Sequence, residues 1–82
     1  MSTNLRVGNI STTIAEEDLM LTFGKFGAVE AVEIARDSVT GRQSGYAIVS
    51  MKHEADAIKA VSMLNFTQYE GRTIGVGRMH TR

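Results

Sequence analysis

The order of its apolar patterns limits this chain's possible folds more than any other feature. Six short segments show either two-residue or three-to-four-residue spacing, in the order strand, helix, strand, strand, helix, strand. With 82 residues, the chain has material for one hydrophobic core and not for a second. We therefore expect a single domain over residues 1–82, with its core within about residues 4–79.

Two segments have helical spacing. In residues 15–26, large apolar side chains recur at three- and four-residue steps: Leu19, Met20, Phe23 and Phe26. Thr13 followed by Glu16 predicts a capping box at the start of this helix, and Gly27 predicts its stop.

The second predicted helix covers about residues 53–65 and carries one apolar face: Ala57, Ala60, Val61 and Leu64. Asn65 is expected to end it in the left-handed conformation. Across the chain, we expect these large side chains in the core: Leu19, Phe23, Phe26, Val49, Leu64 and Ile74.

Four segments alternate as strands do: Leu5–Val7, Val32–Ala35, Tyr46–Met51 and Thr73–Gly77. Turn formers in Asp37–Arg42 predict a hairpin between the second and third strands. The order predicts an α+β fold, a four-stranded antiparallel sheet with two helices on one face. The opposite face is then open, and we expect it to be the binding surface.

Composition excludes several classes of protein. Nine Lys and Arg balance nine Asp and Glu, so the chain lacks the polybasic coat of proteins that grip duplex DNA indiscriminately. No stretch reaches the roughly 18 consecutive apolar residues of a membrane span, and the first residues lack a signal-peptide pattern. Cysteine is absent, which fits a reducing compartment. We expect a cytoplasmic protein made as it stands, without a membrane partner.

The zero net charge is unevenly distributed. Residues 15–26 and 52–65, the two helical segments, carry a net charge of −2, and the rest of the chain carries +2. Every arginine lies outside these segments, and every lysine lies within them. The predicted sheet, loops and tail therefore have a mild positive bias.

Leu5–Ile10 and Ser44–Met51 lie on the first and third predicted strands. These two segments resemble the hexapeptide and octapeptide motifs of the RNA-recognition motif family. Further matches follow in the family's order: Leu19 with Phe23, Phe26 and Gly27, then Asp37–Arg42, Ala60-Val61, Leu64-Asn65 and Gly71-Arg72. The resemblance covers nearly the whole chain. It implies a ferredoxin-like βαββαβ fold that binds single-stranded RNA on the open sheet face.

The chain departs from the family where stacking aromatics are expected. The family has three on the open face, whereas this chain keeps Tyr46 and has Arg6 and Ile48 at the other two positions. Ser44 stands where the octapeptide has a basic residue. A stacked base is worth about 1–3 kcal/mol, so two lost platforms remove about 2–6 kcal/mol of binding free energy.

The resemblance implies roles for these strand residues. Tyr46 would stack a base, or its presence reflects strand propensity alone. Arg6 would stack on a base or pair with phosphate, or else pair with Glu33 across the strands. Three roles are open for the Ile48 side chain: contact with the ligand, contact with a protein, or burial beneath the tail Arg78–Arg82.

Residues at the edges of the predicted sheet complete the candidate site. Asn9 would line the groove, and Arg36 and Arg42 would hold phosphates beside the hairpin. The alternative for both arginines is solubility and pairing with Asp37.

Past the last strand, Arg78 and His80 would add contacts along the bound RNA, the alternative being a frayed tail. Gly75 and Gly77 leave that strand nearly bare, which either admits close backbone approach or weakens the platform. Phe66 stands where the family often has glycine, and we expect it to pack locally and not to bind.

Nothing in the sequence indicates catalysis. His53 and His80 have no cysteine partners and no metal-ligand spacing, so we expect no enzyme activity, metal or cofactor.

The first hypothesis is a single-stranded RNA binder of modest affinity and loose sequence preference. The alternative is a protein-interaction module, for a second copy or a foreign partner, that uses Ile48, the glycine-bare strand and Met79. The absence of a Gly-rich or Arg-rich tail is compatible with a small bacterial protein.

Overall fold

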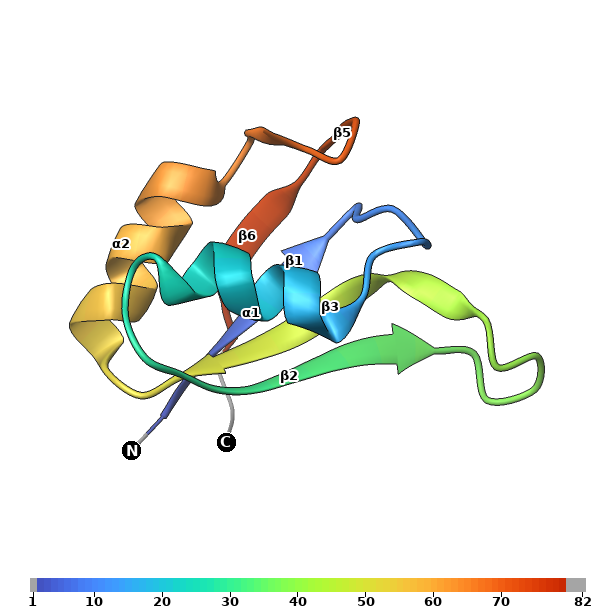
Figure 1. Ribbon diagram of the computed structural model, residues 1–82, viewed down its shortest axis with the longest axis horizontal. Coiled ribbons are helices and arrows are strands. Elements are labelled where there is room, and N and C mark those ends of the chain that lie inside the picture. The colour runs from blue at the N-terminus through green and yellow to red at the C-terminus, as the bar shows by residue number, and fades with distance from the viewer. Residues whose placement is uncertain (1, 80–82) are drawn as a thin grey trace.

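The predicted element order is confirmed, with one addition near the C-terminus. The computed structural model describes residues 2–79. Its elements, shown in Figure 1, are β1 (Thr3–Gly8), α1 (Glu16–Gly24), β2 (Val29–Arg36), β3 (Gln43–Met51), α2 (Glu54–Leu64), β4 (Gln68–Tyr69), β5 (Arg72–Thr73) and β6 (Gly75–Arg78). Neither helix is long and apolar enough to cross a membrane.

The sheet has four strands in the order β2-β3-β1-β6, and every neighbouring pair is antiparallel. Both helices lie against the same face of this sheet (Figure 1). The predicted ferredoxin-like architecture is therefore confirmed. The face away from the helices carries no further layer among residues 2–79.

The core lies between the sheet and the two helices. Strand alternation directs one set of side chains inward, and the helices cover them with apolar residues of their own: Leu5, Val7, Val49, Met51, Val76, Leu19, Phe23, Ala57 and Ala60. Of the predicted core, Leu19, Phe23, Val49 and Ile74 are buried. Phe26 and Leu64 pack against this cluster and are partly buried, whereas Met20 faces outward and is exposed.

The ends of α1 differ from the predicted ones. The helix begins directly after Ala15, whose N–H donates to the Asp18 carboxylate at 2.9 Å. This contact replaces the predicted capping box that starts at Thr13. At the other end, α1 stops at Gly24, before Gly27. Gly27 instead fits a crowded site, because a Cβ there would lie 2.1 Å from an Asp56 carboxylate oxygen.

The prediction that Asn65 ends α2 in the left-handed conformation is wrong. Asn65 is extended, with φ −62° and ψ 132°, and Phe66 takes the left-handed conformation with φ 63°. The reason is tertiary. The Asn65 Oδ1 atom accepts a hydrogen bond from the Val76 N–H at 2.9 Å, and the Phe66 N–H donates to the Ile74 carbonyl at 2.8 Å.

The short β4–β5 hairpin was not predicted. Its two turn residues, Glu70 and Gly71, have φ of 51° and 83°. Two consecutive residues with positive φ fit a type I′ turn, the connection that suits the twist of a two-residue hairpin. Glutamate is an unusual residue for the first of these positions, so the sequence gives little signal for this turn.

Candidate nucleic-acid interface

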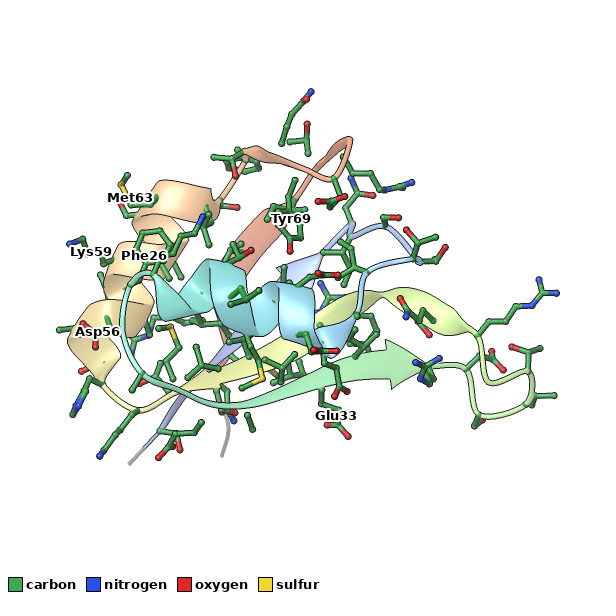
Figure 2. The ribbon with its side chains drawn as sticks, in the orientation of Figure 1. Phe26, Glu33, Asp56, Lys59, Met63 and Tyr69 are labelled. Carbon is green, nitrogen blue, oxygen red and sulfur yellow. The ribbon has the colours of Figure 1, made fainter. Side chains whose placement is uncertain are left out.

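The outward side chains of the four strands form rows across the open face. In one row, Ile48 lies between Arg6 and Glu33, and Arg6 is followed by Gly77 on the far side. In the next row, Tyr46 is opposite Gly8. The predicted placement of Tyr46, Arg6, Ile48 and Glu33 on one face is confirmed. Glu33 projects from β2 clear of both helices (Figure 2).

Arg6 and Tyr46 form a stacked pair on this face. The Arg6 Cζ atom lies 4.5 Å from the centroid of the Tyr46 ring. Gly8 makes room for this contact, because a Cβ at that position would come within 3.1 Å of an Arg6 guanidinium nitrogen. An exposed cation–π contact is worth about 0.5–1 kcal/mol. It therefore orients the guanidinium without holding it fixed.

The contact with Tyr46 argues against the alternative in which Arg6 pairs with Glu33. Within residues 2–79, the one ion pair joins Arg78 to Glu54. Ile48 separates Arg6 from Glu33 in the strand register. Arg6 is thus directed toward the aromatic residue, and Glu33 is the acidic group on the β2 side of the face.

Asn9 has a structural role at the end of β1. Its backbone is left-handed with φ 59°, and its side-chain Nδ2 donates to the Thr73 carbonyl at 2.7 Å. Its Oδ1 and carbonyl oxygen accept hydrogen bonds from the Arg72 guanidinium at 2.9 and 3.3 Å. Contact between Asn9 and RNA stays a prediction.

Arg72 belongs to the site, although it was not among the predicted site residues. Held by Asn9, it lines a groove on the open face together with Arg6 and Tyr46. The signal was present in the Gly71-Arg72 match to the family pattern. Arg72 lies outside the two main strand motifs, so the sequence gives no reason to place it near Arg6. The two residues line the same groove only in the folded chain.

The two arginines at the hairpin are not paired with Asp37 in the part of the chain that the structure describes. The Asp37 carboxylate instead accepts hydrogen bonds from the N–H groups of Val39 and Thr40, at 2.8 and 2.9 Å. These backbone bonds, Thr40 first, lower the pKa of Asp37 below its ordinary value. Arg36 and Arg42 both remain exposed and line a hollow at the base of the hairpin.

Arg78 lies outside the surface formed by Arg6, Tyr46 and Ile48. Its Cα is opposite Leu5, so strand alternation directs its side chain toward the helix layer. There its guanidinium donates to the Glu54 carboxylate at the first turn of α2. His80 lies outside the described residues.

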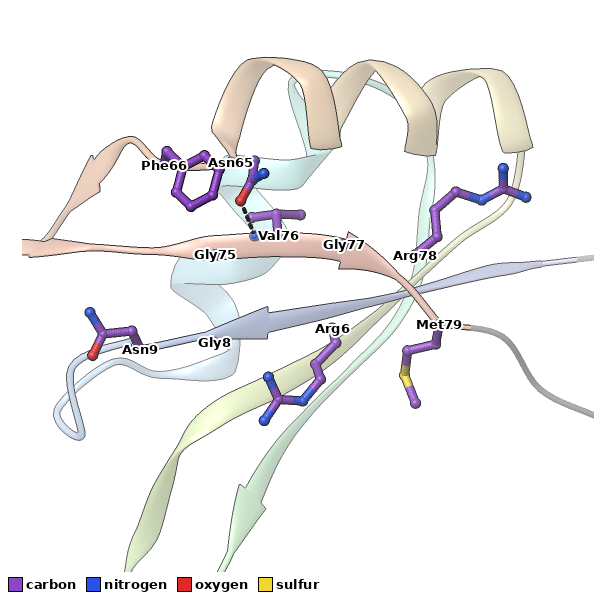
Figure 3. Close-up of a pocket in the computed structure, with 10 residues that line it drawn as sticks. All are labelled: Arg6, Gly8, Asn9, Asn65, Phe66, Gly75, Val76, Gly77, Arg78 and Met79. Carbon is purple, nitrogen blue, oxygen red and sulfur yellow. Dashed lines mark hydrogen bonds between the residues drawn. The ribbon is translucent and has the colours of Figure 1, made fainter.

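Phe66 corrects another expectation. Its side chain is 79% exposed, so it does not pack locally as predicted. It lines a groove along β6 at the edge of the open face (Figure 3). Residues 2–79 contain no group of three or more His, Asp or Glu side chains placed to hold a metal ion.

An open antiparallel sheet that presents a tyrosine–arginine pair among further arginines has the side chains that bind single-stranded nucleic acid in known modules. Comparison with known families agrees: the RNA recognition motif model matches residues 5–75. The chain belongs to the RNA recognition motif family. Membership in a family of recognition modules agrees with the prediction that the chain is not an enzyme.

Individual relatives show the same likeness. RbpA of Synechocystis sp. is 30% identical over 79 residues, which cover 96% of this chain and 78% of RbpA. The crystal structure of RNA Binding Protein PG1 superposes with a TM-score of 0.94 and 34% identity, covering 99% of this chain and 98% of that one. A Sex-lethal protein/RNA complex gives a TM-score of 0.90 at 27% identity, covering 100% of this chain and 49% of that one.

Proposed function

We propose that the chain binds single-stranded RNA on its open sheet face, with modest affinity and loose sequence preference. The observation that carries this proposal is the stacked Arg6–Tyr46 pair, with Arg6 Cζ 4.5 Å from the ring centroid, on the exposed face of this family's fold. Supporting it, a similar fold is seen in the Sex-lethal protein/RNA complex.

The pair acts as a composite platform for one base. A guanidinium plane stacks on a base much as an aromatic ring does, while its N–H groups remain available for phosphate oxygens. Arg72, held in the adjacent groove, provides a second cation for the backbone. Half-buried Ile48 contributes apolar contact to a base or ribose.

Both qualities of the proposed binding follow from these groups. Stacking tolerates every base because each has a π-face, so the preference is loose. Tyr46 is the one aromatic side chain on the strands of this face among the described residues, so the affinity is modest. With two to four phosphates contacted, the logarithm of affinity falls with the logarithm of salt at a slope of about −1.4 to −2.8.

Fluorescence anisotropy with a labelled mixed-sequence octaribonucleotide at low salt tests the proposal. Tyr46→Ala removes the ring and is expected to weaken binding about 5- to 150-fold. Leu21→Ala is the matched control, since Leu21 is 74% exposed on α1 in the helix layer. Equal loss in both variants, or no binding by the unaltered chain, contradicts the proposal.

Half-buried Ile48 on β3, together with half-buried Met79 directly after the bare strand β6, supports a competing proposal of a protein-interaction face. Strand addition along the edge of β6 is opposed by Asn65, whose side chain already accepts the Val76 N–H. Sedimentation at rising concentration separates the two proposals. A monomer at high concentration removes the homodimer, and Tyr46→Ala then weakens RNA binding while sparing a contact centred on Ile48.

A further inference from the structure

Phe66 combines two unfavourable features. Its ring is 79% exposed to solvent, and its backbone is in the left-handed region with φ 63°. Bulky residues rarely adopt that conformation, because the Cβ atom crowds the following carbonyl. Glycine would remove both costs. Strained backbone of this kind clusters at binding sites, so the combination of an exposed aromatic ring and a left-handed backbone points to a role in binding.

The loop that carries Phe66 is tied to the sheet. The Phe66 N–H donates to the Ile74 carbonyl at 2.8 Å, and the Ile74 N–H donates to the Thr67 carbonyl at 2.9 Å. Just before it, the Asn65 side chain accepts the Val76 N–H at 2.9 Å. These bonds hold the backbone of the loop at the edge of β6, and Figure 3 shows Phe66 beside Asn65 at that edge.

The ring borders an open groove of about 700 Å³ that follows β6. Gly75 and Gly77 lie along this groove, and a Cβ built on Gly77 would meet no described atom within 4 Å. The charged residues among its lining are Arg6 and Arg78, and of these Arg78 is paired with Glu54, so Arg6 is the cation that the groove offers to a ligand. The groove therefore lets a chain approach the strand closely and favours a negatively charged one.

This groove is continuous with the Tyr46 site. Arg6 and Asn9 line both the groove along β6 and the groove beside Tyr46. A polymer that lies on Tyr46 and Arg6 can thus continue over Gly8 and Gly75 to the ring of Phe66. The shared cation and the bare strand favour a nucleic-acid strand as the occupant over an apolar protein segment.

We infer that Phe66 is a second base-stacking residue, which binds a further nucleotide of the single-stranded RNA held by Tyr46 and Arg6. The inference rests on the proposed function and extends it to a residue outside the strand motifs. Because a phenyl ring offers stacking and no hydrogen bonds, this position accepts any base. It lengthens the binding footprint without adding sequence preference.

Three substitutions of Phe66 test the inference by anisotropy with octauridylate. Phe66→Gly removes the ring and relaxes the backbone, so the variant folds, which its thermal unfolding verifies. We expect it to bind about 5- to 150-fold more weakly. Phe66→Leu, which keeps apolar bulk without a π-face, is expected to lose most of the same affinity, and Phe66→Tyr to stay within about twofold of the unaltered chain.

The outcomes separate this inference from the proposed function. If the unaltered chain binds octauridylate and Phe66→Gly binds equally well, the inference fails and the proposed function stands. If Phe66→Leu binds as tightly as the unaltered chain, apolar contact explains the effect and stacking is refuted. If the unaltered chain does not bind and Phe66→Gly abolishes a self-association seen by sedimentation, the groove is a protein contact and both proposals fail.

Discussion

The middle of the open face and its β6 edge each present an aromatic side chain, but the two side chains come from different parts of the chain. In the middle, strand side chains supply the contacts, with Arg6 stacked on Tyr46. At the edge, the outward strand positions are Gly75 and Gly77, and the aromatic ring comes from Phe66 in the α2–β4 loop. The comparison shows that a strand with glycines at its outward positions can line a groove, while a residue of a neighbouring loop supplies the aromatic ring.

The double variant Tyr46→Ala, Phe66→Gly tests both regions together and has the largest expected effect. The two side chains are proposed to stack on different bases, so their contributions are expected to add. The loss is about 2–6 kcal/mol, or about 30-fold to 10⁴-fold in affinity for octauridylate. Anisotropy of the double variant beside both single variants measures it. A double variant no weaker than Tyr46→Ala would show that the edge contributes nothing.

Urea unfolding compares two positions with positive φ, Phe66 at the β6 edge and Gly45 at the start of β3. Phe66→Gly relieves a left-handed strain of about 1–2 kcal/mol but adds about 0.5–1 kcal/mol of unfolded-chain entropy, so its free energy of unfolding rises slightly. Gly45→Ala does the reverse at φ 86° and is expected to lose about 1 kcal/mol. A destabilised Phe66→Gly would mean that the ring packs against the fold and is not displayed for binding.

Glu33→Gln examines the β2 side of the middle region. Glu33 lies next to Ile48 on the open face, where its charge repels phosphate. For a phosphate about 8 Å from the Glu33 carboxylate in water, removing the repulsion is worth about 0.5 kcal/mol. The affinity for RNA therefore rises about twofold at low salt. The gain should vanish near 1 M salt, where the Debye length is about 3 Å. Anisotropy at both salt concentrations decides, and a gain that survives high salt would contradict this account.

The smallest expected effect concerns the hairpin, away from both regions. The pKa of Asp37 is lowered in the folded chain, chiefly by the Thr40 N–H, from an ordinary value of 3.8. A carboxyl group of this kind stabilises the fold above its unfolded pKa and loses that contribution as the pH falls through its folded pKa. Unfolding at about pH 7 and about pH 3 should show a smaller acid-induced loss for Asp37→Asn than for the unaltered chain. Identical losses would refute this role.

Much of the fold follows from spacing alone. Two apolar periods, one for strands and one for helices, predicted the element order and placed Arg6, Tyr46 and Ile48 on one face. The helix ends were less predictable. The end of α2 depends on Asn65 reaching Val76, eleven residues further along, and local sequence carries no sign of that bond.

The site was only partly predictable for a related reason. The stacking of Arg6 on Tyr46 depends on a diagonal relation between strands, and on a glycine at position 8 opposite the tyrosine. Arg72 and Phe66 lie outside the two strand motifs. Arg72 joins the site through its hydrogen bonds to Asn9, and Phe66 joins it through the hydrogen bond from its N–H to the Ile74 carbonyl, just before β6. Such residues are found from the assembled structure, since their neighbours are distant in the chain.

The central claim is that one RNA strand occupies both regions of the open face, and an amide-resolved NMR titration with octauridylate tests it most directly. The account predicts that the amides of Tyr46 and Gly8 shift together with those of Gly75 and Gly77. It also predicts contacts between base protons and the Phe66 ring. Shifts confined to α1 and α2, or none on the open face at saturating RNA, would contradict it.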